Sequence, residues 1–196
     1  MATTSVLISI GDYLKTSYRP DREYIDGELL ERHVDKWDHA RIQALLCIWF
    51  GSREQTWNIV VATGLRVKVA SSRVRIPDVC LVSMDPHPPV ILTPPLLVIE
   101  ILSSVDTYAS MTQRCNDYIR MGVPALWIID PANRTGHMWT SGTWTETVTP
   151  SVPGSPIHVD LKTILISSKA RTEAQRPKYK PYTLPHHCVK TTSGFQ

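Results

Sequence analysis

Two acidic residues interrupt neighbouring apolar segments that have the character of buried β-strands. Asp78 follows Pro77 and opens the run Val79–Val82, and Glu100 lies inside Leu96–Leu102, the most continuous apolar run of the chain. A buried carboxylate is costly unless a cation compensates its charge. Either residue alone is readily explained as a turn former or as half of an ordinary ion pair, but the two together favour a site.

A divalent metal ion is the cation that suits these two carboxylates best. Mg²⁺ takes oxygen ligands, usually one or two carboxylates completed by water and substrate phosphate. Such an ion polarises a phosphoryl oxygen, lowers the pKa of an attacking water and neutralises developing charge. The pair therefore indicates phosphodiester hydrolysis, provided that the side chains of Asp78 and Glu100 converge on one point.

Length and composition predict one domain. A chain of 196 residues with 42% hydrophobic residues can build one core, which we place at 1–166, followed by a disordered or weakly ordered tail at 167–196. No apolar run approaches the roughly 20 residues of a membrane span, and no basic segment opens a secretory signal, so we expect a cytoplasmic protein without a membrane partner. A net charge of +3 is compatible with a polyanion partner without indicating one.

The first third of the chain predicts a helix, a hairpin and a longer helix. We expect a short helix over 9–18 and a hairpin over 23–31, because Asp26-Gly27 is a two-residue turn signal. A helix capped by Asp38 should follow and end near Gly51. Its apolar residues recur at helical spacing, at Ile42, Leu45, Leu46 and Trp49.

The middle of the chain predicts a βαβ crossover. Strands are expected at 58–62, 65–69 and 73–76, and a surface loop at 85–95. After the Glu100 strand, we expect a helix that ends at Gly122, with N-cap candidates and an apolar stripe. The N-cap candidates are Ser103, Ser104 and Asp106, and the stripe comprises Tyr108, Met111, Cys115, Tyr118 and Ile119.

The strand over 125–130 then closes the crossover. Strand, helix and strand in this order place the Glu100 and Trp127 strands parallel to each other, which makes the fold class α/β. An edge hairpin over 136–149 and one further element over 156–165 complete the prediction.

The order of these elements and motifs resembles a known family. Arg-Ile-Pro-Asp-Val at 75–79, Val-Ile-Glu-Ile-Leu-Ser at 98–103, and Tyr118 before Gly122-Val-Pro and Trp127-Ile-Ile-Asp-Pro are similar to the Uma-type restriction endonucleases, part of the PD-(D/E)xK nuclease superfamily. The resemblance covers about residues 10–150. It implies a restriction-endonuclease-like core, in which a central mixed β-sheet is flanked by helices.

The resemblance also implies a set of site residues. Asp78 and Glu100 would bind Mg²⁺, for which Mn²⁺ can substitute, together with the backbone carbonyl of Ile101. Glu23 matches an N-terminal acidic position that joins the metal shell directly or through water, although a surface charge on the hairpin explains it nearly as well.

Arg114 departs from the superfamily pattern. The position expected to hold lysine after the second acidic residue is Leu102, and the family's lysine looks displaced to the next helix, where this chain has Arg114. The i, i+4 spacing puts Arg114 and Tyr118 on one helical face. Arginine can bind a phosphate bidentately but cannot exchange a proton with water. The alternatives are a solvated helix residue or a partner of Asp117.

Two further groups of residues have two interpretations each, and one further residue has a single one. The basic residues of the central strands could form a rim for phosphates or be ordinary exposed strand residues; they are Arg66, Lys68, Arg73 and Arg75. His39 and Gln43 match family positions near the site, but a helix-surface pair is the favoured interpretation. Asp130, before Pro131, is expected to end a strand.

The leading hypothesis is a Mg²⁺-dependent DNA endonuclease, with Asp78, Glu100, Arg114 and Glu23 as the catalytic residues. The competing hypothesis is a nuclease-like domain that binds DNA or a protein partner without cutting. We expect DNA as partner, no small-molecule cofactor, and, by analogy alone, a homodimer.

Overall fold

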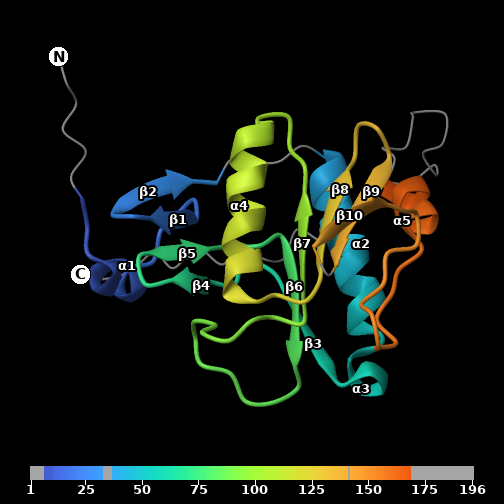
Figure 1. Cartoon of the computed structure of the whole chain (residues 1–196), viewed down its shortest axis with the longest axis horizontal. Helices are drawn as coiled ribbons and strands as arrows, with labels where there is room; N and C mark the ends of the chain where they lie inside the picture. The colour runs from blue at the N-terminus through green and yellow to red at the C-terminus, as the bar shows by residue number, and fades with distance from the viewer. Residues whose placement is uncertain (1–6, 33–36, 141, 169–196) are drawn as a thin grey trace, which may run out of the picture.

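Two β-sheets organise the computed structural model, which describes residues 7–32, 37–140 and 142–168. The smaller sheet is antiparallel, and its strand order is β2-β1-β5-β4. Its strands are β1 (Arg22–Ile25), β2 (Glu28–Glu31), β4 (Val67–Ala70) and β5 (Arg73–Arg75). Helix α1 (Ile10–Lys15) lies beside this sheet at the end of the molecule (Figure 1).

The larger sheet has six strands in the order β10-β9-β8-β7-β6-β3. Its strands are β3 (Ile59–Ala62), β6 (Val79–Ser83), β7 (Leu97–Ile101), β8 (Leu126–Asp130), β9 (Thr135–Thr140) and β10 (Thr143–Glu146). Strands β7 and β8 are parallel and the other neighbours are antiparallel. The predicted crossover, the edge hairpin and the α/β fold class with a mixed central sheet are confirmed.

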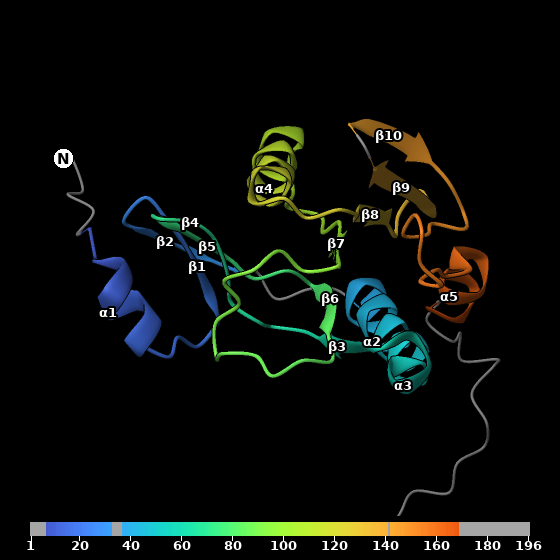
Figure 2. The ribbon, with the colours of Figure 1, turned by 60° about the horizontal axis from the view of Figure 1, so that its bottom comes forward.

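Helices cover both faces of the larger sheet (Figure 2). Helix α4 (Tyr108–Met121) lies on one face; α2 (Trp37–Gly51) and α5 (Leu161–Ser168) lie on the other, with the short α3 (Glu54–Trp57) at the end of α2. Successive side chains of β6 and β7 point to opposite faces of the sheet and pack into two separate cores. Val79, Leu81, Leu97 and Ile99 pack toward α2, whereas Cys80, Val82 and Val98 pack toward α4.

Local sequence signals explain where most elements begin and end. Asp26 and Gly27 both have positive φ, 51° and 100°, as the predicted two-residue turn of the β1–β2 hairpin requires. Gly122, at φ 96°, ends α4 as expected. No helix among the described residues is long and apolar enough to cross a membrane.

Several local predictions are wrong in detail. Helix α4 is capped by Thr107 in a capping box with Ser110, so the three predicted caps are not the N-cap. Tyr108, assigned to the apolar stripe, is 91% exposed. Asp38 lies inside the first turn of α2 and not before it. The last predicted element is a helix, α5; the predicted tail lies outside the described residues from position 169 onward.

Candidate active site

A cavity of about 430 Å³ opens where the small sheet meets the larger one. The hairpin β1–β2, the start of β6, the end of β7 and the first turns of α2 and α4 contribute to its lining. Three of the predicted catalytic residues, Glu23, Asp78 and Arg114, line it, as does Ile101. The charged and polar lining also includes Glu31, Arg32, His39, Arg75, Ser103, Asp106, Ser110 and Gln113.

Asp78 is buried at the base of this cavity, with 2% of its surface exposed, and four groups hold it. Oδ2 accepts a hydrogen bond of 2.7 Å from the Ile101 N–H and lies 3.3 Å from His39 Nε2, while Oδ1 accepts from Arg32. The backbone oxygen accepts from Gln43 Nε2 at 2.7 Å. Burial acts to raise the pKa of Asp78, but His39 and Arg32 outweigh it and lower that pKa.

Glu100 lies on the neighbouring strand and has no exposed surface. Its Oε2 accepts from Arg114 Nη1 at 3.0 Å and its Oε1 accepts from the Tyr118 hydroxyl at 2.8 Å. Burial raises the pKa of Glu100 to about 7, with Asp78 adding to the rise and Arg114 opposing it. These donors cover the carboxylate, so Glu100 is not itself among the residues that line the cavity.

Arg114 and Tyr118 share one face of α4, as the i, i+4 spacing predicts. Besides Glu100, the Arg114 guanidinium reaches Asp106, with Nη2 and Oδ1 3.3 Å apart. The alternatives of a solvated residue or a partner of Asp117 are therefore wrong. Arg114 lines the cavity on one side and holds the buried acid on the other, so it lies between solvent and Glu100.

Glu23 takes part in a buried ion-pair network and is not a surface charge. Its Oε2 accepts from Arg75 Nη1 at 2.6 Å, and its Oε1 accepts from the Ile76 N–H at 3.1 Å. Arg75 also donates through Nε to Asp117 Oδ2 at 2.8 Å. The network connects β1, β5 and α4, which positions the small sheet against the helix that carries Arg114.

The three arginines among the basic residues of the central strands are held by partners within the protein, so neither an open phosphate rim nor an ordinary exposed strand face describes them. Arg75 is buried in the network above, and Arg73 pairs with Asp26 and Asp117. Arg66 lies 4.4 Å from the centre of the Tyr13 ring and donates to backbone carbonyls of α1 and its end. Asp130 ends β8 as predicted, and its Oδ1 accepts from the next turn, at Ala132 and Asn133.

Sequence reasoning missed Arg32 and chose the wrong interpretation for His39 and Gln43. Arg32 directly follows β2, where no periodicity marks it, yet it pairs with Asp78. His39 is 5% exposed and, with Gln43, faces Asp78 from α2, so the helix-surface interpretation is wrong. The signal available was their i, i+4 spacing, which places both on the face of α2 that packs on the sheet.

The acidic pair offers the type of ligand atom that Mg²⁺ binds. Asp78 and Glu100 are on adjacent strands, and with the Ile101 carbonyl they offer the oxygen donors that Mg²⁺ prefers. Within the described ranges, no cluster of three or more His, Cys, Asp or Glu side chains is arranged to hold a metal. Because Arg32 and Arg114 neutralise the two carboxylates in this structure, a metal would have to displace guanidinium contacts from both.

Comparisons with known proteins identify a family and a similar fold. A family model, Uma2, described as "Putative restriction endonuclease", matches residues 12–162. A crystal structure described as a putative nuclease belonging to DUF820, from Anabaena variabilis, is similar with a TM-score of 0.71 and 19% identity, covering 83% of this chain and 99% of that one. A DrdV–DNA complex matches at a TM-score of 0.35 and 16% identity, covering 66% of this chain and 78% of that one. No curated protein matches.

Proposed function

The chain belongs to the Uma2 family of restriction-endonuclease-like proteins, and on that premise we propose that it is a Mg²⁺-dependent endonuclease that hydrolyses phosphodiester bonds of DNA. The observation that carries the proposal is the approach of Asp78 and Glu100 at one end of β6 and β7, joined by the hydrogen bond from the Ile101 N–H to Asp78. Buried acids with cationic neighbours at the base of a cavity are typical of functional sites.

The two cavity arginines supply the phosphate contacts in this proposal. Arg32 and Arg114 both line the cavity, and a guanidinium matches the geometry of two phosphate oxygens. When a phosphate enters, each guanidinium can exchange a carboxylate oxygen for a phosphate oxygen without leaving the cavity. Neither can act as an acid or base, because arginine stays protonated.

The neighbours of the acids orient them. His39 and the Ile101 N–H fix the Asp78 carboxylate, and the Tyr118 hydroxyl fixes that of Glu100. A Mg²⁺ ion held by Asp78, Glu100 and the Ile101 carbonyl would supply Lewis-acid activation of the phosphate and of a water. Glu23 is committed to Arg75, so we assign it the support of the cavity wall.

Nicking of supercoiled plasmid DNA tests the proposal. We expect cleavage with Mg²⁺ or Mn²⁺, none with EDTA, and at least about a hundredfold loss in Asp78→Asn and Glu100→Gln, which keep side-chain size. Glu28→Gln, an exposed residue of β2, is the matched control and should cut normally. Absence of metal-dependent cleavage, or full activity in Asp78→Asn, would overturn the proposal.

Arg114 favours a second candidate, a nuclease-like domain that binds DNA without cutting. Its guanidinium occupies Glu100 and Asp106 and cannot exchange a proton. DNA affinity without cleavage, unchanged in Glu100→Gln, would support this candidate. Cleavage gained in Arg114→Lys would show that the arginine alone ended catalysis. Linear product formed without a nicked intermediate would in turn support a homodimer.

A further inference from the structure

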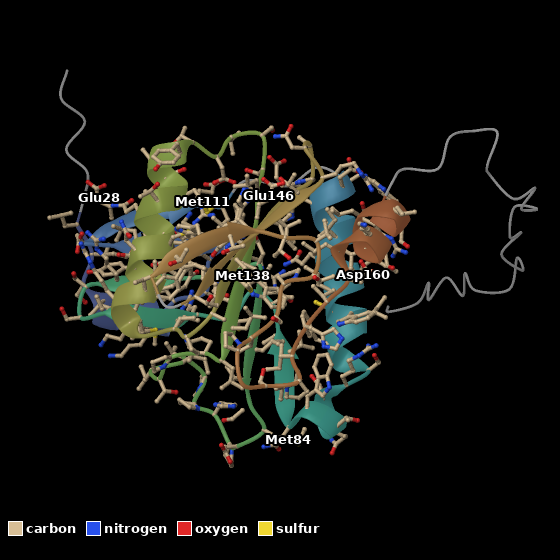
Figure 3. All side chains as sticks on the ribbon, turned by 45° about the vertical axis from the view of Figure 1, so that its right-hand side comes forward. Glu28, Met84, Met111, Met138, Glu146 and Asp160 are labelled. Atoms are coloured by element: carbon tan, nitrogen blue, oxygen red, sulfur yellow. The ribbon has the colours of Figure 1, made fainter. Side chains whose placement is uncertain are left out.

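A second cavity, of about 460 Å³, adjoins the first between α4 and the β9–β10 hairpin. Its apolar lining is buried or half-buried and comprises Leu102, Met111, Cys115, Ile119 and Ile128. Tyr108, His137 and Trp144 line its more exposed edge. We call this cavity the aromatic cleft; Met111 on α4 and Glu146 on β10, labelled in Figure 3, mark the two elements that flank it.

Strand register places the aromatic groups on one face of the sheet. On β10, Trp144 lies opposite Trp139 of β9. On the other edge of β9, His137 lies opposite Ile128 of β8. Because side chains alternate along a strand, His137 and Trp139 share the face that packs toward α4, while Met138 packs into the opposite core. Trp144 extends that face beyond the helix and is 41% exposed.

The aromatic cleft adjoins the catalytic cavity and shares two lining residues with it. Ser103 and Asp106 line both, and Asp106 contacts Arg114 on the catalytic side. The cleft therefore lies next to the place where a phosphate would contact Arg114, within reach of a neighbouring group of the same ligand. Thr112, Asn116 and His137 add hydrogen-bonding groups to the apolar lining. Flat, apolar faces with polar edges are the chemistry of a nucleobase, which stacks on exposed aromatic side chains.

We propose, on the basis of the function proposed above, that the aromatic cleft receives an unpaired nucleobase of the nucleic acid whose phosphate lies in the catalytic cavity, stacked on Trp144. A base inside a duplex must leave its stack and its partner to reach the cleft. The site therefore selects substrates with single-stranded or unpaired bases beside the scissile phosphate.

Binding without cleavage tests this inference. In EDTA, the full chain is titrated into a short single-stranded oligonucleotide that contains 2-aminopurine, whose emission falls when it stacks. We expect quenching, with affinity about tenfold weaker and quenching lost in Trp144→Ala, and both retained in Trp144→Phe. Trp37→Ala, an exposed tryptophan on the opposite face of the sheet, is the control and should bind normally. The same oligonucleotide in a fully paired duplex should bind more weakly.

Three results would overturn the inference: no binding of the oligonucleotide, equal affinity in Trp144→Ala and wild type, or equal affinity for the single strand and the paired duplex. The assay contains no metal and measures no cleavage. If plasmid cleavage requires Asp78 but oligonucleotide binding does not require Trp144, the inference about the cleft is wrong and the proposed nuclease function stands. If binding requires Trp144 but the protein never cleaves DNA, the inference about the cleft stands and the proposed nuclease function is wrong.

Discussion

The Asp78 carboxylate accepts a hydrogen bond from the Ile101 N–H, 2.7 Å away, and thereby ties the start of β6 to the end of β7. Ile101 directly follows Glu100, so this bond brings the two buried acids to one place. Their charges are close enough for Asp78 to raise the pKa of Glu100. Arg32 and Arg114 offset that repulsion, because each of them pairs with one of the two acids.

Metal affinity should increase when Arg32 is removed. Arg32 lies against Asp78 and competes with any cation that approaches it. We expect Arg32→Met to bind Mn²⁺ about tenfold more tightly in calorimetry, equivalent to about 1.4 kcal/mol. Arg22→Met, which removes a similar arginine from the more exposed pair with Glu31, is the control and should leave affinity unchanged. Weaker binding in Arg32→Met would show that Arg32 supports the site in another way.

Metal affinity should also rise with pH around neutrality. The pKa of Glu100 is raised to about 7, so its carboxyl group is largely protonated below that pH and ionised above it. The pKa of Asp78 is lowered, so Asp78 stays ionised throughout. Because a metal ligand must be deprotonated, we expect Mn²⁺ affinity to increase between about pH 6 and pH 8, with proton release on binding. In Glu100→Gln the affinity should be low and flat, and a wild-type affinity independent of pH would contradict the assignment.

The buried network around Arg75 should dominate the stability of the small sheet. Arg75 holds Glu23 and Asp117, all three nearly inaccessible to solvent. Arg75→Ala leaves the buried Glu23 carboxylate without a cationic partner and leaves Asp117 with Arg73 alone, so we expect the free energy of unfolding to fall by about 3 to 5 kcal/mol in urea titrations. Arg73→Ala, on the same strand but partly exposed, should lose about 1 kcal/mol. Equal losses in the two variants would mean that burial of the pair is not what matters.

Stability should fall at alkaline pH in part because of Tyr13. Burial raises the pKa of Tyr13 from 10.0 to about 12, and its hydroxyl donates to the Arg22 carbonyl at 2.7 Å. The unfolded chain therefore loses this proton first, so stability is full below pH 10 and is lost as pH rises toward 12. Tyr13→Phe should flatten this decline by up to about 3 kcal/mol. Tyr108→Phe removes a hydroxyl that is exposed to water in the folded chain and should leave the slope unchanged.

Local and medium-range features of this fold follow from the sequence, whereas its ion pairs do not. The turn at Asp26-Gly27, the end of α4 at Gly122 and the parallel pair β7–β8 each depend on residues near one another in the chain. The pairs that define the cavity join Arg32 to Asp78 across 46 positions and Arg75 to Glu23 across 52. No periodicity encodes such partners.

The alternation of Arg73 and Arg75 with apolar residues illustrates this limit. On its own the pattern is typical of a half-exposed strand. Arg75 is instead buried, because α4 covers it and supplies its partner Asp117. In the same way, the sequence predicts the helical face on which His39 lies. Its contact with Asp78 depends on the packing of α2 beside β6, which the sequence pattern does not encode.

The most direct measurement is a crystal structure of the protein soaked with Mn²⁺, read by anomalous scattering. Our account predicts one peak between the carboxylates of Asp78 and Glu100, within bonding distance of both, with the Arg32 and Arg114 guanidinium groups moved away from them. A site without a peak, in which the two arginines still hold the two acids, would contradict it.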